Sequence, residues 1–530
     1  MNASSSAGSS GLQFTHPYLA VVLGGGFTGM LAAAALSRHA DVIVVEREQL
    51  PRTPALPTDL PRARHAQLLT GDGARLVDTV LPGSTDHWLA EGARRMPVPA
   101  GIAGRTPVSR LGRRPHAQYL LACSRDLLDR AVRRQVPDLP GVSVLDGTEA
   151  AELTGTAEHV TGVRVRDTTG GETYRLDADL VIDATGRHSG TPSRLAALGL
   201  PTVHEDVSDA GIVSATRIFR APRGTDNCPV LTARSPLVQP VPGPFAPRRA
   251  LPARTATLVP VEGGRWLVTL TGAGDDRPSE HAGRFVPFAR RCGSLIGDLI
   301  ADAEPLSEVR LTRDTADRRR RYEQLASWPT GFVVLGGAVV SLAADCGQGL
   351  SLAAHGAVAL GRALRRHGMD DAALAVRTQR AVGRLVQEPW ALATGEALPF
   401  PAPGRIAVRR TYVDVVAPSA PAAPFLRPSA ALDLLRDTAR RRPSAGASPA
   451  RQSAPGAATG SLTATPDPSP AAGSRSPASS GATSPLPAFS AAPRPSGSVP
   501  EAGRLPRRLG FTPTALRRIG GANRRKPADD

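Results

Sequence analysis

Lysine is almost absent from this sequence: Lys526 is the only one, and all the other residues among the 64 Lys and Arg are arginine. A phosphate-binding loop of the G-x-x-x-x-G-K-[ST] type needs a lysine that reaches the phosphates, so this class of NTPase is excluded. The chain also has no G-x-S-x-G segment. This absence argues against a serine hydrolase that exposes its nucleophile on such a turn.

Cysteine is also scarce. Cys123, Cys228, Cys292 and Cys346 lie far apart, with no C-x-x-C pair and no secretory leader ahead of them. This pattern predicts reduced thiols in a cytoplasmic protein. The apolar run at 18–36 has the length of a membrane span, but four glycines interrupt it and no basic segment precedes it. It fits a strand, a turn and a helix better, so we do not expect a membrane protein.

The formal net charge of +17 is concentrated at the C-terminal end. From residue 401 onward there are 19 basic and 7 acidic residues, so the first 400 residues carry only about +5. No basic face interleaved with aromatic residues and no nucleic-acid-binding module is visible, so nucleic acid is not an expected partner.

The composition changes along the chain and predicts its organisation. Residues 443–530 are rich in Pro, Ala, Ser and Arg and poor in branched aliphatic residues, which predicts a disordered tail. We expect residues 1–17 to be disordered as well and 401–442 to form a helical extension. The basic end of the tail could dock on an acidic carrier protein or an anionic membrane, although a disordered end without a partner is the simpler interpretation.

The first motif follows an apolar segment at 18–23 and precedes an alanine-rich one. Gly24, Gly26 and Gly29 fit G-x-G-x-x-G: they permit a tight turn, close approach of a pyrophosphate, and close packing of helix on strand. The phosphates then lie at a helix N-terminus, where free N–H groups favour anions. A second apolar strand at 41–45 ends in Glu46, which is placed to bind an adenosine ribose. Arg47 and the long polar segment after it favour FAD over NAD.

A second motif follows a strand expected at 177–182. It resembles the second fingerprint of the FAD-dependent monooxygenases with the aromatic-hydroxylase type of fold. The matching residues are Asp183, Ala184, Gly186, Arg187 and Ser189. The resemblance makes Asp183 and Gly186 candidates for cofactor binding. In that family a helix also begins with Ser-Arg, and its arginine reaches the cofactor. Arg125 in "ACSRDLLDRAV" matches, although an exposed arginine in a first helical turn is the alternative interpretation.

The third motif, "VVLGGAVVSLAADCGQGLSL" at 333–352, resembles the family's strand, Gly-Asp-Ala, loop and helix. The matching cofactor-binding residues are Gly336, Gly347, Gln348 and Gly349. Gly337 replaces the acid, so we expect FAD to be held more loosely than usual and Gly337→Asp to tighten it. Asp345 either compensates or is a solvated loop acid. The helix N-terminus that stabilises negative charge on the reduced flavin is retained.

The sequence from 18 to 428 resembles the actinobacterial flavin epoxidases of polyether antibiotic biosynthesis. The resemblance rests on the motifs above and on "LPRARHAQLLTGDGARLVDTVLPG", "YEQLASWPTGFVVLG" and "QEPWALATGEALPFP". It places Arg64 and His65 near the cofactor, and His65 is the one candidate for a catalytic role. A helix-capping or core position for His65 is equally open.

The predicted fold class is α/β. A Rossmann-like FAD-binding domain of the glutathione-reductase type spans 18–205 and 306–400, and an inserted antiparallel sheet at 206–305 forms the substrate domain. A hairpin turn is expected at Gly263 and Gly264. Trp266 lines the substrate pocket or belongs to the core of that sheet.

The resemblance implies an FAD-dependent monooxygenase that inserts one oxygen atom from O2 through a flavin C4a-hydroperoxide. Its expected substrate is a hydrophobic olefin of a polyketide or terpenoid, free or bound to a carrier protein. Electrons would come from NAD(P)H or from a separate flavin reductase. An aromatic or polyketide hydroxylase and a non-catalytic binding protein of the same fold are the alternatives. No metal site is expected, because no His, Asp or Glu constellation suggests one, and tryptophan-type flavin halogenases need a lysine and a W-x-W-x-I-P segment that are absent.

Overall fold

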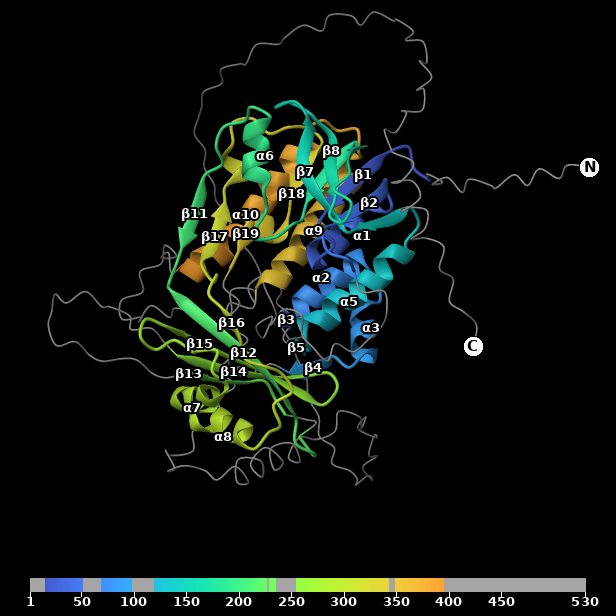
Figure 1. Ribbon diagram of the computed structural model, residues 1–530. Helices are drawn as coiled ribbons and strands as arrows, with labels where there is room; N and C mark the ends of the chain where they lie inside the picture. Colours follow the sequence, from blue (N-terminus) through green and yellow to red (C-terminus); the bar gives the residue numbers. More distant parts are fainter. Residues whose placement is uncertain are drawn as a thin grey trace, which may run out of the picture. The chain divides into compact units, whose positions relative to one another are not determined.

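The computed structural model describes residues 15–50, 68–97, 119–225, 228–234, 254–342 and 348–394 (Figure 1). These residues all belong to the larger of two compact units, which takes in residues 1–441 and 509–530. The predicted helical extension at 401–442 and the predicted disordered tail at 443–530 lie outside the described residues. So does the predicted disordered N-terminus, except for residues 15–17.

A five-stranded parallel sheet forms the centre of the described part, with the strand order β18-β10-β1-β2-β6. Its strands are short and apolar, and β1, β10 and β18 are buried along their whole length, as expected for a parallel sheet covered on both faces. Their bounds are β1 Leu19–Leu23, β2 Asp41–Glu46, β6 Val142–Asp146, β10 Leu180–Asp183 and β18 Phe332–Val334.

Helices and a second sheet cover the parallel sheet. Helix α1 packs against β1, β2 and β10 and against α9, which in turn contacts α2 and α10. The antiparallel sheet β7-β8-β9 contacts β2 and β10. The bounds are α1 Phe27–Leu36, α2 Gly71–Val80, α9 Gly349–His367, α10 Leu374–Thr394, β7 Thr148–Gly155, β8 Val160–Asp167 and β9 Thr173–Asp177.

The single strand expected at 177–182 is wrong, because the chain breaks there into two strands of different sheets. Strand β9 ends at Asp177, and β10 begins at Leu180. Between them the Asp179 carboxylate accepts a hydrogen bond from the backbone N–H of Leu19 at 2.9 Å. This polar contact ties the start of β10 to the start of β1, so the apolar run alone did not define the strand boundary.

A five-stranded antiparallel sheet, β13-β14-β15-β12-β16, forms a separate layer with helices α7 and α8 on one face (Figure 1). The predicted hairpin turn is confirmed: Gly263 and Gly264 join β14 to β15, and both have the positive φ that such a turn requires. The bounds are β12 Ile212–Arg220, β13 Leu231–Arg234, β14 Thr255–Val261, β15 Arg265–Ala273, β16 Arg310–Thr312, α7 Ala282–Cys292 and α8 Ser294–Ala301.

Trp266 belongs to the core of this layer. Its side chain is fully buried in the apolar cluster that the sheet forms with α7 and α8. The other face of the sheet carries Val259 and Leu267, which cluster with Leu120 and Ala122 of the neighbouring strand β5, Tyr119–Ala122. Of the two interpretations of Trp266, the core position is therefore the one observed.

The remaining elements form two small sheets and short helices. Strands β3, β5 and β4 make one antiparallel sheet, and β11, β17 and β19 make the other. The bounds are β3 Leu69–Thr70, β4 Arg94–Pro97, β5 Tyr119–Ala122, β11 Glu205–Ser208, β17 Asp317–Arg320, β19 Val340–Ser341, α3 Ser84–Ala90, α5 Arg125–Gln135, α6 Thr191–Ala197, and the 3-10 helices η3 Val136–Asp138, η4 Tyr322–Gln324 and η5 Gly336–Ala338.

The α/β fold class, with additional antiparallel sheets, is thus confirmed. The glutathione-reductase type and the domain boundaries stay predictions. Within the described residues, no helix is both long enough and apolar enough to cross a membrane.

Candidate cofactor site

The first glycine loop joins β1 to α1 and is shaped as the sequence predicts. Gly24 has φ of 100°, and a Cβ there would lie 2.7 Å from the carbonyl oxygen of Ala184. A Cβ on Gly29 would lie 1.8 Å from the carbonyl oxygen of Gly24. Both positions therefore require glycine, one for the turn and its contact with the next loop, the other for the packing of α1 on β1.

Gly26 differs from these two glycines, because a Cβ there would meet nothing within 4 Å. It is the N-cap residue of α1 and lines a cavity. The first N–H groups of a helix have no partner within the helix, and together with the helix dipole they favour an anion. Open space at Gly26 is thus what close approach of a phosphate to this helix end would need.

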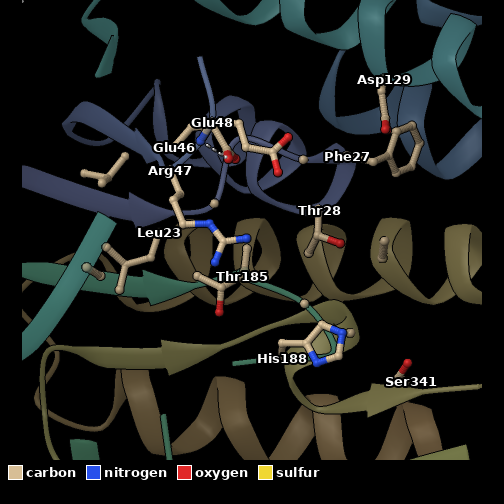
Figure 2. A pocket seen from close by; sticks show the side chains of 18 of the residues that line it. Leu23, Phe27, Thr28, Glu46, Arg47, Glu48, Asp129, Thr185, His188 and Ser341 are labelled. Carbon is tan, nitrogen blue, oxygen red and sulfur yellow. Dashed lines mark hydrogen bonds between the residues drawn. The ribbon is translucent and has the colours of Figure 1, made fainter. Parts of the chain in front are cut away.

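Glu46 ends β2 beside this loop and also lines the cavity. One carboxylate oxygen accepts the backbone N–H of Gly25 at 2.6 Å, and the other accepts that of Glu48 at 2.9 Å. Each oxygen keeps a second lone pair for a ribose hydroxyl. Arg47 points from the same segment into the cavity (Figure 2).

The cavity has a volume of about 530 Å³ and joins all three sequence motifs. Of the residues predicted to bind the cofactor, seven line it: Gly24, Gly26, Glu46, Arg47, Arg125, Gly186 and Gly349. Gly337, which stands in the place of the family's acid, lines it too. The structure therefore brings together segments that lie more than 300 residues apart in the sequence.

Helix α5 supplies one wall of the cavity. The Ser124 hydroxyl caps it by accepting the backbone N–H of Leu127 at 3.1 Å, so the Ser-Arg helix start occurs as expected. The Arg125 guanidinium lies 5.2 Å from the ring centre of Phe27, and its Nε donates to Asp129 at 2.8 Å. One helical face thus directs a cation toward the first glycine loop.

The sequence reasoning missed two residues of this wall, Asp129 and Arg133. Both line the cavity, and Arg133 Nε donates to the carbonyl oxygen of Gly25 at 2.8 Å. Their spacing from Arg125 is i+4 and i+8, which places all three on one helical face. This periodicity was the signal that could have found them.

Asp183 lies behind the cavity and does not line it. Its carboxylate is fully buried and accepts the backbone N–H of Thr185 at 2.8 Å and the Thr185 hydroxyl at 2.6 Å. It also accepts the hydroxyls of Ser189 and Thr191. These contacts hold the turn that carries Gly186, whose φ is 84°. We therefore propose that Asp183 stabilises this turn rather than contacting the cofactor directly.

Arg187 fixes the same turn from its other side. Its guanidinium makes a two-pronged ion pair with Asp314, at 2.9 and 2.8 Å, and donates to Ser341 Oγ at 2.9 Å. The hydrogen bonds from Arg187 hold the pKa of the Asp314 carboxyl below its ordinary value. The neighbouring His188 lines the cavity with an exposed side chain, 3.5 Å from Asp314. The sequence reasoning did not single out His188 or Asp314.

In the third motif, Gly336 does not line the cavity but packs against helix α1. Its φ is 59°, and a Cβ there would lie 2.5 Å from Thr28 Oγ1 in α1. Gly337 packs against the second motif, since its Cβ would lie 3.2 Å from Gly186 Cα and 3.3 Å from Arg187 N. At Gly337, where the family has an acid, the loop of the third motif therefore packs directly against the loop of the second motif.

Helix α9 begins at the cavity with Gly349, and Gln348 is its N-cap residue. Gln348 does not line the cavity, and its side-chain oxygen is buried without a hydrogen bond to any described residue. Three predicted residues, Arg64, His65 and Gly347, lie outside the described residues, as does Asp345. Their roles stay predictions.

The cysteines of the described part do not line the cavity. Cys123, Cys228 and Cys292 are free and buried. Burial raises the pKa of the Cys228 and Cys292 thiols to about 12, and it raises that of Cys123 as well. Among the residues that the structure describes, no group of three or more His, Cys, Asp or Glu side chains is arranged to hold a metal ion.

The described residues fit a dinucleotide cofactor. The cavity offers open space at Gly26, a helix N-terminus at each of α1 and α9, a carboxylate at Glu46, and cations at Arg47 and Arg125. A parallel sheet whose first strand is followed by a glycine turn that lines such a cavity is typical of a dinucleotide-binding protein.

The chain belongs to the FAD binding domain family, whose model matches residues 18–373, and its cofactor is FAD. It is similar to Protein Rv3254 of Mycobacterium tuberculosis, with 28% identity over 404 residues that cover 72% of this chain and 82% of the relative.

Among solved structures, the fold is similar to a triple mutant of the flavin-dependent brominase Bmp2. The TM-score is 0.50 at 13% identity, covering 71% of this chain and 86% of the other. A probable FAD-dependent monooxygenase of Pseudomonas aeruginosa, PqsL, has a TM-score of 0.49 at 18% identity, covering 71% of this chain and 93% of the other.

Proposed function

We propose that the protein is an FAD-dependent monooxygenase that transfers one oxygen atom of O2 to a hydrophobic small molecule. The observation that carries the proposal is the meeting of three motifs at one cavity, with Gly349 at the N-terminus of the 19-residue helix α9 on its wall. A helix N-terminus favours nearby negative charge, which supports a cofactor that becomes anionic on reduction. FAD, when bound, supplies the redox and oxygen chemistry.

The protein's own residues bind and orient the cofactor in this proposal. Gly26 leaves room for the phosphates, Glu46 accepts hydrogen bonds from the adenosine ribose, and Arg125 presents a cation at the first loop. Asp183 and Arg187 hold the second loop in place through the contacts described above. No side chain is asked to move a proton, because epoxidation needs mainly the positioning of the alkene.

The antiparallel sheet is our proposed substrate layer. Its face opposite α7 and α8 carries the aliphatic side chains of Val259 and Leu267 and the hydroxyls of Thr216 and Thr269, which lie 3.1 Å apart. All four of these side chains are buried. Val259 and Leu267 pack against β5, so the support for a substrate role is the apolar character of the layer as a whole and the resemblance given above, which suit an uncharged, largely hydrophobic substrate.

The specific reaction that we propose is epoxidation of an olefin of a polyketide or terpenoid. The support for this step is the resemblance of 18–428 to the flavin epoxidases of polyether biosynthesis. Hydroxylation of an aromatic or polyketide ring is the competing outcome. The electron donor that we propose is NAD(P)H, or reduced flavin delivered by a reductase.

The test is oxygen transfer by the full-length protein with FAD, a reductant and isotopically labelled O2. A linear polyene and a phenolic polyketide of similar size serve as paired substrates. We expect the polyene product to gain one labelled oxygen atom for each epoxide formed. Label in the phenol alone would show that the reaction is hydroxylation and not epoxidation. Label in neither product, with FAD bound and reduced, would overturn the oxygenase proposal.

A further inference from the structure

A buried carboxylate, Glu262, reaches from the antiparallel sheet to the helix that forms one wall of the cofactor cavity. Glu262 is 6% exposed and opens the turn between β14 and β15. One of its oxygens accepts the backbone N–H of Ser124 at 2.9 Å, and the other accepts the Ser124 hydroxyl. The two residues are 138 positions apart in the sequence. Both oxygens of the acid are thus used on one residue of another layer.

The surroundings of Glu262 are built for this approach. Gly92, with φ of 106°, leaves room, since a Cβ there would lie 3.0 Å from the Glu262 Cβ. Arg265 brings a guanidinium nitrogen to within 3.7 Å of the Glu262 carboxylate. Burying a charge is unfavourable unless it is hydrogen-bonded and paired, and here both conditions are met.

Ser124 passes the contact on to helix α5. Its hydroxyl hydrogen points to Glu262, and its hydroxyl oxygen accepts the N–H of Leu127 at 3.1 Å as the helix cap. A capping hydroxyl held by an acid has one fixed orientation. The negative charge of Glu262 at this helix N-terminus is also favourable to the helix dipole.

Helix α5 in turn places the groups that line the cavity. Arg125 is its first residue and stacks over Phe27, and Arg133, two turns on, donates to the carbonyl oxygen of Gly25 at 2.8 Å. Phe27 and Gly25 flank Gly26 of the first glycine loop. The chain of contacts therefore runs from Glu262 through Ser124 and α5 to the loop that faces the cofactor.

We propose that Glu262 is a positioning residue for FAD. It lies in the proposed substrate layer and holds the N-terminus of α5, so that Arg125 stays in register with the first glycine loop. This inference requires only that FAD binds, and it does not depend on the proposed oxygen transfer. A titration without turnover therefore tests it separately from the proposed function.

The experiment is a titration of full-length apoprotein with FAD, followed by flavin fluorescence, for wild type, Glu262→Gln and Glu262→Ala. Glu262→Ala leaves Ser124 as the cap of α5 but removes the acid that orients its hydroxyl. We therefore expect FAD binding to weaken by about threefold to tenfold, with the full effect of a helix cap as the upper bound. Glu262→Gln keeps one acceptor oxygen for Ser124, and its affinity should fall between the other two. The visible circular dichroism of saturated FAD should change in Glu262→Ala and return toward wild type in Glu262→Gln.

Two controls separate positioning from general stability. Leu258→Ala opens the buried core toward α7 and α8, so it should lower the melting temperature without weakening FAD binding. Glu304→Ala removes an exposed ion pair with Arg220 and should change neither quantity. If the Glu262 variants behave like Leu258→Ala, with a lower melting temperature and unchanged FAD affinity and dichroism, the positioning role is wrong.

A double-variant comparison tests whether Glu262 acts through the arginine. We expect Glu262→Ala to weaken FAD binding less in an Arg125→Ala background than in wild type, because the group that it positions is already gone. An undiminished effect in that background would show that Glu262 acts by another route and would overturn the proposal.

Discussion

Gly26 and Gly29 of the first motif have different roles, which a single added methyl group at each position can distinguish. Gly26→Ala adds a Cβ that meets no protein atom within 4 Å, so the apoprotein should lose only about 1 kcal/mol of stability, the effect of alanine at an N-cap position. The methyl group would occupy space at the helix end where we expect a phosphate, and FAD affinity should fall by at least about tenfold, or about 1.4 kcal/mol. Unchanged affinity, measured by titration, would place the phosphates elsewhere.

Gly29→Ala is the matched control, because its Cβ would lie 1.8 Å from the carbonyl oxygen of Gly24. Overpacking of this kind costs about 3 kcal/mol or more. The apoprotein itself should therefore be destabilised clearly more than Gly26→Ala in urea unfolding.

At Gly337 the structure changes what we expect from restoring the acid. A Cβ there would crowd Gly186 Cα and Arg187 N at 3.2 and 3.3 Å, and hydrogen bonds hold that turn on both sides. Gly337→Ala should lower stability by about 1 to 3 kcal/mol. Gly337→Asp should bind FAD more tightly than Gly337→Ala, yet no more tightly than wild type. Equal FAD affinities of the two variants would mean that the carboxylate does not reach the cofactor.

At the scale of single residues, the sequence predicted the backbone demands at Gly24 and Gly29, where a side chain would clash. The cofactor-binding roles of Gly26 and Gly349 stay predictions, because neither position requires glycine for the fold. Asp183 was the harder case: its position after a strand is visible in the sequence, whereas its four hydrogen bonds within the turn are not. Arg187 was noticed only as part of the fingerprint. Its partner Asp314 lies 127 positions away, and a single sequence gives no sign of that pairing.

At the scale of elements, the Arg187–Asp314 ion pair joins the loop at 313–316 to the turn of the second motif. The contribution of this ion pair to stability should depend on pH. The folded-state pKa of Asp314 is lowered chiefly by its hydrogen bonds to Arg187. Its contribution to stability is therefore full above the unfolded pKa of about 3.9 and is lost as the pH falls through the lower folded pKa.

Urea unfolding of wild type and Asp314→Asn from neutral to acidic pH checks this expectation. The difference in unfolding free energy should be about 1 kcal/mol or less, because the Asp314 side chain is 46% exposed. It should be steady at neutral pH and shrink as the pH falls below about 4. A difference that does not depend on pH would contradict the ionic role of the carboxylate.

Helices and strands were predicted correctly from the sequence where one apolar segment forms one strand of a single sheet. The strand, turn and helix at the first motif follow the expected pattern, with β1 at Leu19–Leu23 and α1 at Phe27–Leu36. The prediction failed at 177–182, where adjacent residues enter two different sheets. It also overlooked the cavity-facing side of α5, although the spacing of Arg125, Asp129 and Arg133 was available in the sequence.

At the scale of the whole molecule, the contacts between layers lay beyond the reach of the sequence. The family match ends at residue 373, and the cavity takes its last residue from α9, at Ala353. We therefore expect truncation after Ser444 to leave FAD affinity unchanged within about twofold in a fluorescence titration, since no residue of the cavity is removed. A large loss of affinity would show that the tail contributes to the site.

We expect FAD to lie in the cavity where the three motifs meet. A crystal structure of the protein with FAD tests it most directly. We predict electron density for the pyrophosphate against Gly26 at the N-terminus of α1, for the ribose at Glu46, and for the flavin ring toward Gly349 at the N-terminus of α9. Density for FAD elsewhere in the protein, or a cavity that remains empty at saturating FAD, would contradict this binding site.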